Sequence, residues 1–137
     1  DIYVWATIKC KSDYKTSVSH ITEDGLSQIT GVNIRTVKRS IQRLKECGAM
    51  QVTTQIIDGC KRRNSYYIAD TQTNFYIVDN RFFTKNRPPK IAGFLLLLKA
   101  ICLNNTNTIL WNIGQIADAV GMNRNTVSTL IKRSAAD

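Results

Sequence analysis

The stretch from Thr30 to Met50 reads TGVNIRTVKRSIQRLKECGAM and decides the fold of the first part of the chain. Between Arg35 and Lys45 it contains five basic residues, and its first acidic residue is Glu46. Its apolar residues recur at the spacing of helical turns, at Ile34, Val37, Ile41 and Leu44. The pattern predicts a helix that packs through one face and carries positive charge on the opposite face.

Capping residues set the limits of this helix and of a shorter helix before it. Asn33 is a preferred N-cap residue, and Gly48 is suited to end the long helix. Thr22 is predicted to cap the shorter helix, because two acidic residues follow it where the helix dipole favours negative charge. Gly31 is predicted to end that helix. A short helix, a glycine turn and a longer capped helix form a helix-turn-helix.

Two strands are predicted after the long helix. Residues 49–57 (AMQVTTQII) and 65–69 (SYYIA) are rich in β-branched and aromatic residues, and DGCKRRN between them contains a turn signal. They predict a β-hairpin whose tip carries Lys61, Arg62 and Arg63, placed either to contact phosphate or enter the minor groove of DNA, or as a solvated loop tip. A first helix is predicted over Ile2–Lys9, although that composition also suits a strand. The order of elements is that of a winged helix.

An internal repeat divides the chain. Shifted by ninety positions, residues 31–43 (GVNIRTVKRSIQR) lie over residues 121–133 (GMNRNTVSTLIKR) with six identities in thirteen positions. The same shift places residues 2–9 over residues 92–99 without a gap. We therefore predict two copies of one module, joined through residues 79–90, whose two prolines interrupt helix and strand.

Composition limits the class of protein and its partners. The 137 residues are 43% hydrophobic and 8% aromatic, as in globular proteins, and the net charge is +9. Such a charge favours an anionic partner, either nucleic acid or an anionic membrane surface. The longest apolar run, Ile91–Leu98, stops at Lys99 and is too short to span a bilayer.

Cysteine and histidine usage argues against a metal site and against catalysis. The four cysteines have no CxxC spacing, and His20 is the one histidine. We expect reduced thiols in core or loop positions of a cytoplasmic protein, no metal and no cofactor. His20 is expected to be structural, and the scattered carboxylates suggest no catalytic group, so an enzyme is not expected.

The segment LSQITGVNIRTVKRSIQRLKECGAM (26–50) resembles the helix-turn-helix core of bacterial winged-helix proteins. Many members of this group are the DNA-binding parts of plasmid and phage replication initiators and replisome organisers, and several carry winged helices in tandem. The resemblance covers residues 2–69. In the second copy, residues 74–83 resemble a lead-in strand and turn, residues 94–103 a first helix, and residues 112–133 a helix-turn-helix.

The resemblance implies a mainly helical α+β fold with small hairpin wings. It divides the chain into two tandem winged helix-turn-helix domains, residues 1–72 and 73–137. The wing of the second domain is absent from the chain, which stops at Asp137.

Residue by residue, the resemblance places the base-reading positions of the first copy at Asn33, Arg35, Thr36 and Arg39. Arg35 and Arg39 can form bidentate hydrogen bonds to guanine, and Asn33 can reach adenine if it is not used as an N-cap. Lys38 and Arg43 are expected to contact phosphate.

In the second copy the matching positions are Asn123, Asn125, Thr126 and Thr129, with Lys132 and Arg133 further along the helix. Arg124 replaces the apolar Ile34 and is expected to face solvent or DNA. This helix is less basic, so the second copy is expected either to bind DNA more weakly or to contact protein.

The function expected is sequence-specific binding of double-stranded DNA, as part of a plasmid or phage replication initiator. A transcriptional regulator and a winged-helix module for protein interaction are the alternatives. The apolar residues Phe82, Phe83 and Leu95–Leu98 are expected either to fill the second copy or to form a dimer surface. The partners expected are therefore DNA and, as alternatives, a second copy in a homodimer or neighbouring copies side by side on repeats. No membrane partner is expected.

Overall fold

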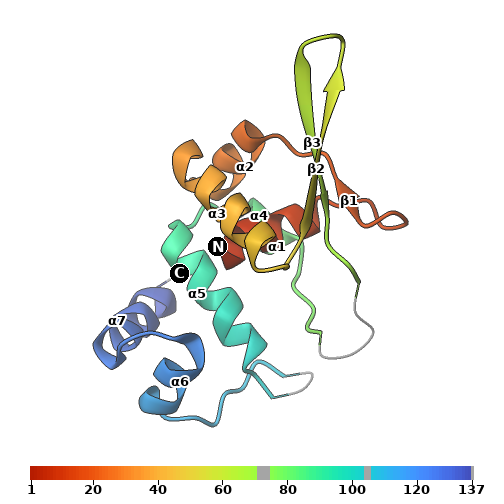
Figure 1. The fold of residues 1–137 in the computed structure, drawn as a ribbon. Helices are drawn as coiled ribbons and strands as arrows, with labels where there is room; N and C mark the ends of the chain where they lie inside the picture. The colour runs from red at the N-terminus through yellow and green to blue at the C-terminus, as the bar shows by residue number, and fades with distance from the viewer. Residues whose placement is uncertain (71–74, 104–105, 137) are drawn as a thin grey trace.

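The computed structural model describes residues 1–70, 75–103 and 106–136 and has a mixed α+β fold (Figure 1). Within these residues, seven helices accompany one three-stranded antiparallel sheet of order β1–β3–β2. The predicted α+β class is confirmed. No helix in these ranges is both long and apolar enough to cross a bilayer.

The elements follow the order of the repeat. The first copy contains α1 (Ile2–Cys10), β1 (Val18–Ser19), α2 (Glu23–Thr30), α3 (Ile34–Glu46), β2 (Gln51–Ile57) and β3 (Lys61–Tyr67). The second contains α4 (Arg81–Thr84), α5 (Pro89–Ala100), α6 (Ile113–Val120) and α7 (Arg124–Ala135). The predicted boundary between residues 72 and 73 lies outside the described residues.

The predicted caps fix the turn between α2 and α3. Thr22 Oγ1 accepts a hydrogen bond from the backbone N–H of Gly25 at 2.9 Å, and Asn33 Oδ1 accepts one from that of Arg35 at 2.9 Å. Gly31 ends α2 with φ 69°, a left-handed conformation that glycine adopts without a Cβ clash. The capping predictions for both helices are confirmed.

The first core joins α1, α2, α3 and the hairpin. It contains Val4, Ile8, Leu26, Val37, Ile41, Leu44, Met50, Tyr66 and Ile68. The predicted stripe was wrong at Ile34, the first residue of α3, which is only half-buried and lies outside the core cluster. Ser40 completes the buried stripe instead, and its hydroxyl donates to Asp1 Oδ1 at 2.7 Å.

The hairpin is present, but its basic residues lie elsewhere than predicted. The chain leaves α3 through Gly48 (φ 77°) and reverses between β2 and β3 at Asp58 and Gly59, whose φ angles are 49° and 77°. Because these two left-handed residues make a tight reversal, residue 61 already pairs with residue 57. The cations at positions 61–63 therefore begin β3 and do not form the tip.

The second copy repeats the glycine turn. Asn112 and Gln115 form a capping box at the start of α6, and Gly121 ends α6 with φ 68°. Asn123 caps α7 by accepting from the backbone N–H groups of Asn125 and Thr126 at 2.8 and 3.3 Å. The helix-turn-helix shared by the two copies thus has the same local construction.

The segment before α5 differs from its prediction. The resemblance implied a lead-in strand and turn within residues 74–83. Residues 75–79 lie outside any strand, however, and residues 81–84 form α4; residues 71–74 lie outside the described part. Pro88 and Pro89 were expected to interrupt helix and strand, yet Pro89 is the first residue of α5. The first turn of a helix needs no N–H from that position, so proline is well placed there.

The two copies are packed against each other through α1 and α5 (Figure 1). The apolar cluster between them contains Tyr3, Ala6, Phe83, Ala92 and Leu96. Arg87 donates to the carbonyl of Phe82 at 3.0 Å, and its guanidinium lies 4.6 Å from the centre of the Phe82 ring. The predicted linker is therefore folded onto the joint between the copies.

The apolar run of α5 divides its residues between two clusters. Phe94 is buried in the second core, with Ile91, Ile116, Ala117, Val127 and Leu130. Leu96 is buried against the first copy, in the cluster between the two. This run was expected either to fill the core of the second copy or to form a dimer surface. Neither expectation accounts for Leu96, which is packed against the first copy.

The second core is less covered than the first. Ile8 is fully buried and Ile41 is 6% exposed, whereas their repeat equivalents Leu98 and Ile131 are only half-buried. In the first copy the hairpin side chains cover this side, and the described residues of the second copy include no such hairpin.

Candidate nucleic-acid interface

The outer face of α3 is basic and exposed. Arg35, Thr36, Lys38, Arg39 and Arg43 are all exposed, opposite the buried stripe. Arg35 and Arg39 are one turn apart, so their side chains project from the same face of the helix. In the described part of the chain, neither guanidinium has an acidic partner within ion-pair distance. These two arginines are therefore available to an external acceptor.

The other two cations of this face have acidic partners. Lys38 Nζ lies 3.7 Å from Glu23 Oε2, and Arg43 Nη2 lies 3.0 Å from Asp1 Oδ1. All four side chains are solvent-accessible, and exposed pairs of this kind contribute only ~0–1 kcal/mol. Replacing these carboxylates by a phosphate therefore costs little free energy. Lys38 and Arg43 can make the predicted phosphate contacts only after they leave their present acidic partners.

Asn33 is used as an N-cap. Its Oδ1 accepts from the backbone N–H of Arg35, so only its amide N–H₂ group is left for a ligand. A bidentate adenine contact needs both the oxygen and the nitrogen. Asn33 was predicted to reach adenine only if it did not serve as an N-cap. In this conformation it does serve as an N-cap, so that role is not supported.

The hairpin cations lie on two faces of the sheet. Residues paired across antiparallel strands share a face, and neighbours along a strand alternate. Ile56 is paired with Arg62 and Ile57 with Lys61, so Arg62 lies on one face and Lys61 and Arg63 on the other. Figure 1 shows the hairpin projecting from the helical body, and all three cations are exposed. A partner that contacts all three must surround the hairpin.

His20 connects β1 to the hairpin. Arg63 Nη2 lies 3.2 Å from His20 Nε2, and Ser65 Oγ lies 3.0 Å from His20 Nδ1. A guanidinium can only donate, so Nε2 is the acceptor and Nδ1 carries the hydrogen that Ser65 Oγ accepts. These contacts suit the structural role expected for His20 and give Arg63 a fixed position.

The α7 face of the second copy is less basic, and its predicted residues lie in different environments. Asn123, Arg124, Asn125, Thr129, Lys132 and Arg133 are exposed, and Thr126 is half-buried. Thr129 Oγ1 donates to the carbonyl of Asn125 at 2.9 Å. A Cβ at Gly114 would lie 2.9 Å from Arg124 Nη2, so the Arg124 side chain lies over the start of α6 and leaves the core, as expected from its charge.

The cysteines are all free thiols. Cys47 and Cys60 are exposed, and Cys10 and Cys102 are half-buried. Cys10 is packed against the apolar cluster between the copies, as expected for a core position, but none of the four thiols is fully buried. Cys60 lies in the hairpin turn, in agreement with the expected loop position.

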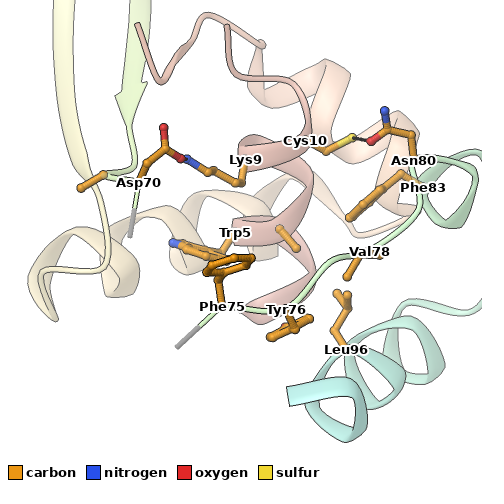
Figure 2. A pocket seen from close by; sticks show the side chains of 12 residues that line it. Trp5, Lys9, Cys10, Asp70, Phe75, Tyr76, Val78, Asn80, Phe83 and Leu96 are labelled. Carbon is orange, nitrogen blue, oxygen red and sulfur yellow. Dashed lines mark hydrogen bonds and ion pairs between the residues drawn. The ribbon is translucent and has the colours of Figure 1, made fainter. Parts of the chain in front are cut away.

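An open pocket of about 410 Å³ lies beside α1, which contributes four residues to its lining: Trp5, Ala6, Lys9 and Cys10 (Figure 2). Its walls include Trp5, Phe75 and Leu96. At its edge, Lys9 Nζ donates to the Ile68 carbonyl at 3.2 Å and pairs with the Asp70 carboxylate. These contacts fasten the end of β3 to α1.

Ser17 adds a second contact to the Asp70 carboxylate, donating from Oγ at 2.6 Å. The hydrogen bonds from Lys9 and Ser17 hold the pKa of Asp70 below its usual value. The Asp70 carboxylate is therefore a structural anchor for the chain that follows the hairpin.

Two features of this surface were not predicted from the sequence: the acidic partners Asp1 and Glu23, and the division of the hairpin cations between two faces. Only the division between two faces had a sequence signal, because the Asp58–Gly59 dipeptide marks the centre of the turn and so sets the strand register.

Comparison of the chain with protein-family models, curated proteins and solved structures found no match. The interface is therefore interpreted from its own residues.

Proposed function

We propose that the chain binds double-stranded DNA sequence-specifically through two tandem winged helices and belongs to a replication initiator of the plasmid or phage type. In the first copy, the order helix, strand, helix-turn-helix and hairpin supports the winged-helix interpretation. The assignment to replication rests on the sequence resemblance. The observation that carries DNA binding is the exposed pair Arg35 and Arg39, one turn apart on α3.

In the proposed complex, α3 lies in the major groove. Arg35 and Arg39 each present a planar fork of donors that fits the O6 and N7 acceptors of guanine, worth ~1–3 kcal/mol of discrimination per contact. Lys38 and Arg43 exchange their carboxylate partners for phosphate oxygens and fix the register of the helix on the duplex.

The hairpin and the second copy extend this contact. Lys61, Arg62 and Arg63 contribute positive charge beside the groove, and their binding is salt-dependent because each phosphate contact releases counterions. The second copy adds α7, with fewer cations, at a spacing fixed by the packed joint. Its part is a weaker contact, which is effectively intramolecular because the packed joint holds α7 on the same chain.

A protein-interaction module is the second candidate, favoured by the less basic α7 face. A transcriptional regulator uses the same interface and differs only in what the bound complex does. The anionic membrane surface, which the net charge alone allowed, is disfavoured because the exposed face of α3 is polar throughout and offers no apolar side to insert.

The test is retention on DNA. Fluorescence anisotropy with random-sequence and selected duplexes should show binding whose affinity falls steeply with salt. The double variant Arg35→Ala, Arg39→Ala should abolish the preference for the selected duplex. Lys15→Ala, which removes a cation from the exposed loop before β1, is the matched control and should retain the preference. A wild-type chain that shows no salt-dependent DNA binding would leave the protein-interaction module as the better proposal.

A further inference from the structure

The end of the hairpin carries an exposed apolar side chain between cations. Ile56 is 69% exposed, and Ile57 beside it is 37% exposed. Only Val52 of β2 is half-buried, so the strand from Thr53 onward has left the protein core. An exposed isoleucine on a projecting strand adds nothing to the core, and water contact there is unfavourable.

The face that carries Ile56 changes character along the hairpin. Val52 is paired with Tyr66, which is fully buried in the first core. The next pair on that face is Thr54 with Asn64, whose side chains are 2.9 Å apart in a hydrogen bond. The last is Ile56 with Arg62. The strand register thus places Ile56 and Arg62 side by side on one face of the hairpin, beyond the core.

The chemistry of this end defines the partner that fits it. Three cations close to the turn require an anionic surface, and Ile56 requires an apolar space within reach of that surface. The minor groove of DNA can supply both, because phosphates line its edges and unstacking a base step at its floor opens a space between two apolar base faces. Apolar side chains of this kind enter between base pairs and unstack them in known minor-groove complexes.

We propose that Ile56 is a wedge that enters one base step from the minor groove and bends the duplex, while Arg62 and Lys61 hold the flanking phosphates. The proposal rests on the proposed DNA-binding function and adds a deformation of the DNA to it. A β-branched side chain suits the role, since its χ1 is restricted and little rotamer freedom is lost on insertion. Pyrimidine–purine steps, which unstack most easily, are the preferred targets.

The experiment uses the full chain and a duplex of about three helical turns selected from a random library by that chain. One sample carries a donor and an acceptor fluorophore at its two ends, and another carries 2-aminopurine at successive positions. Binding is measured by anisotropy, bending by energy transfer at saturation, and unstacking by 2-aminopurine emission. Ile56→Thr removes the apolar wedge and keeps β-branching. Ile57→Thr makes the same change on the opposite face of the hairpin, and Ile56→Leu keeps the apolar volume.

Wild type, Ile57→Thr and Ile56→Leu should bend the duplex and raise 2-aminopurine emission at one step. Ile56→Thr should still bind, with affinity lowered roughly tenfold, but should leave the duplex straight and stacked. Circular dichroism should show all variants folded, because position 56 lies outside the core.

Other outcomes separate the wedge from the proposed function. Tight, sequence-specific binding to a straight duplex, or equal bending by Ile56→Thr, would overturn the wedge and leave DNA binding standing. Failure to bind any duplex would overturn both. Ile56-dependent binding to phosphatidylserine vesicles in place of DNA would assign the hairpin to a membrane surface and would also overturn both.

Discussion

The rings of Tyr3 and Phe83 meet edge to face with their centres 6.4 Å apart, and they join α1 of the first copy to α4 at the start of the second. Both side chains are at least nine-tenths buried. Because this contact is packed with Ala92 and Leu96, the copies have a defined relative position in place of a flexible tether. The spacing of α3 and α7 is thus a property of the fold.

We expect Phe83→Ala to lower the free energy of unfolding by ~3–5 kcal/mol, the usual cost of removing a buried phenylalanine. Urea unfolding followed by circular dichroism measures the change. Phe75→Ala is the matched control, since Phe75 is 63% exposed and its removal should cost within ~0.5 kcal/mol. Equal effects of the two variants would mean that the joint is not packed in solution.

We expect Arg35→Ala and Arg39→Ala each to weaken binding to the selected duplex by ~1–3 kcal/mol while changing random-sequence binding little. In the proposed complex each arginine forms a hydrogen bond to a base only where that base is correct, so the difference in affinity between the two duplexes is the informative quantity. Anisotropy titrations on both duplexes supply it. Equal loss of affinity for both duplexes would mean that these arginines contact phosphate and do not read bases.

Removing the hairpin cations should act differently. Replacing Lys61 and Arg62 by alanine should weaken binding to every sequence and reduce the slope of log K against log salt by roughly 0.9 for each phosphate that is no longer neutralised. Titrations at four or more salt concentrations measure the slope. An unchanged slope would show that the hairpin does not touch the backbone.

Acid should weaken the attachment of β3 to α1. Hydrogen bonds from Lys9 and Ser17 lower the pKa of Asp70 in the folded chain below its ordinary value of 3.8. The contribution of a carboxyl with a lowered pKa is present above that value and is lost as the pH falls through the folded pKa. Asp70→Asn should therefore lower stability near neutral pH and reduce the pH dependence of unfolding below about pH 4. Identical pH profiles for the variant and wild type would contradict this assignment.

The second copy should lengthen the protected DNA. With α7 on the duplex, one chain should protect a region about one turn, roughly 10 base pairs, beyond that covered by α3. Asn125→Ala with Lys132→Ala should shorten the footprint without unfolding the chain, because both residues are exposed. Hydroxyl-radical footprinting measures the length. An unchanged footprint would assign α7 to protein contact, in agreement with the side-by-side assembly considered from the sequence.

The sequence by itself determined the local features of the fold. The caps at Thr22 and Asn33 and the turn at Gly31 depend on hydrogen bonds and backbone angles within a few residues, so composition and spacing were enough to predict them. The helical period placed the basic face of α3 for the same reason. The hairpin was also predicted, but its register was not, and the cations at positions 61–63 were therefore assigned to the wrong part of it.

Only the tertiary structure decided which residues meet between the two copies and which acidic residues pair with the basic face of α3. The contact of Tyr3 with Phe83 joins positions eighty residues apart, and the pairing of Arg43 with Asp1 joins positions forty-two apart. No periodicity or local motif specifies such pairs, because they follow from how whole helices pack and not from the residues beside them. Packing of the two copies likewise placed Leu96 at the joint and Phe94 in the second core, although the two residues are nearly adjacent in one apolar run.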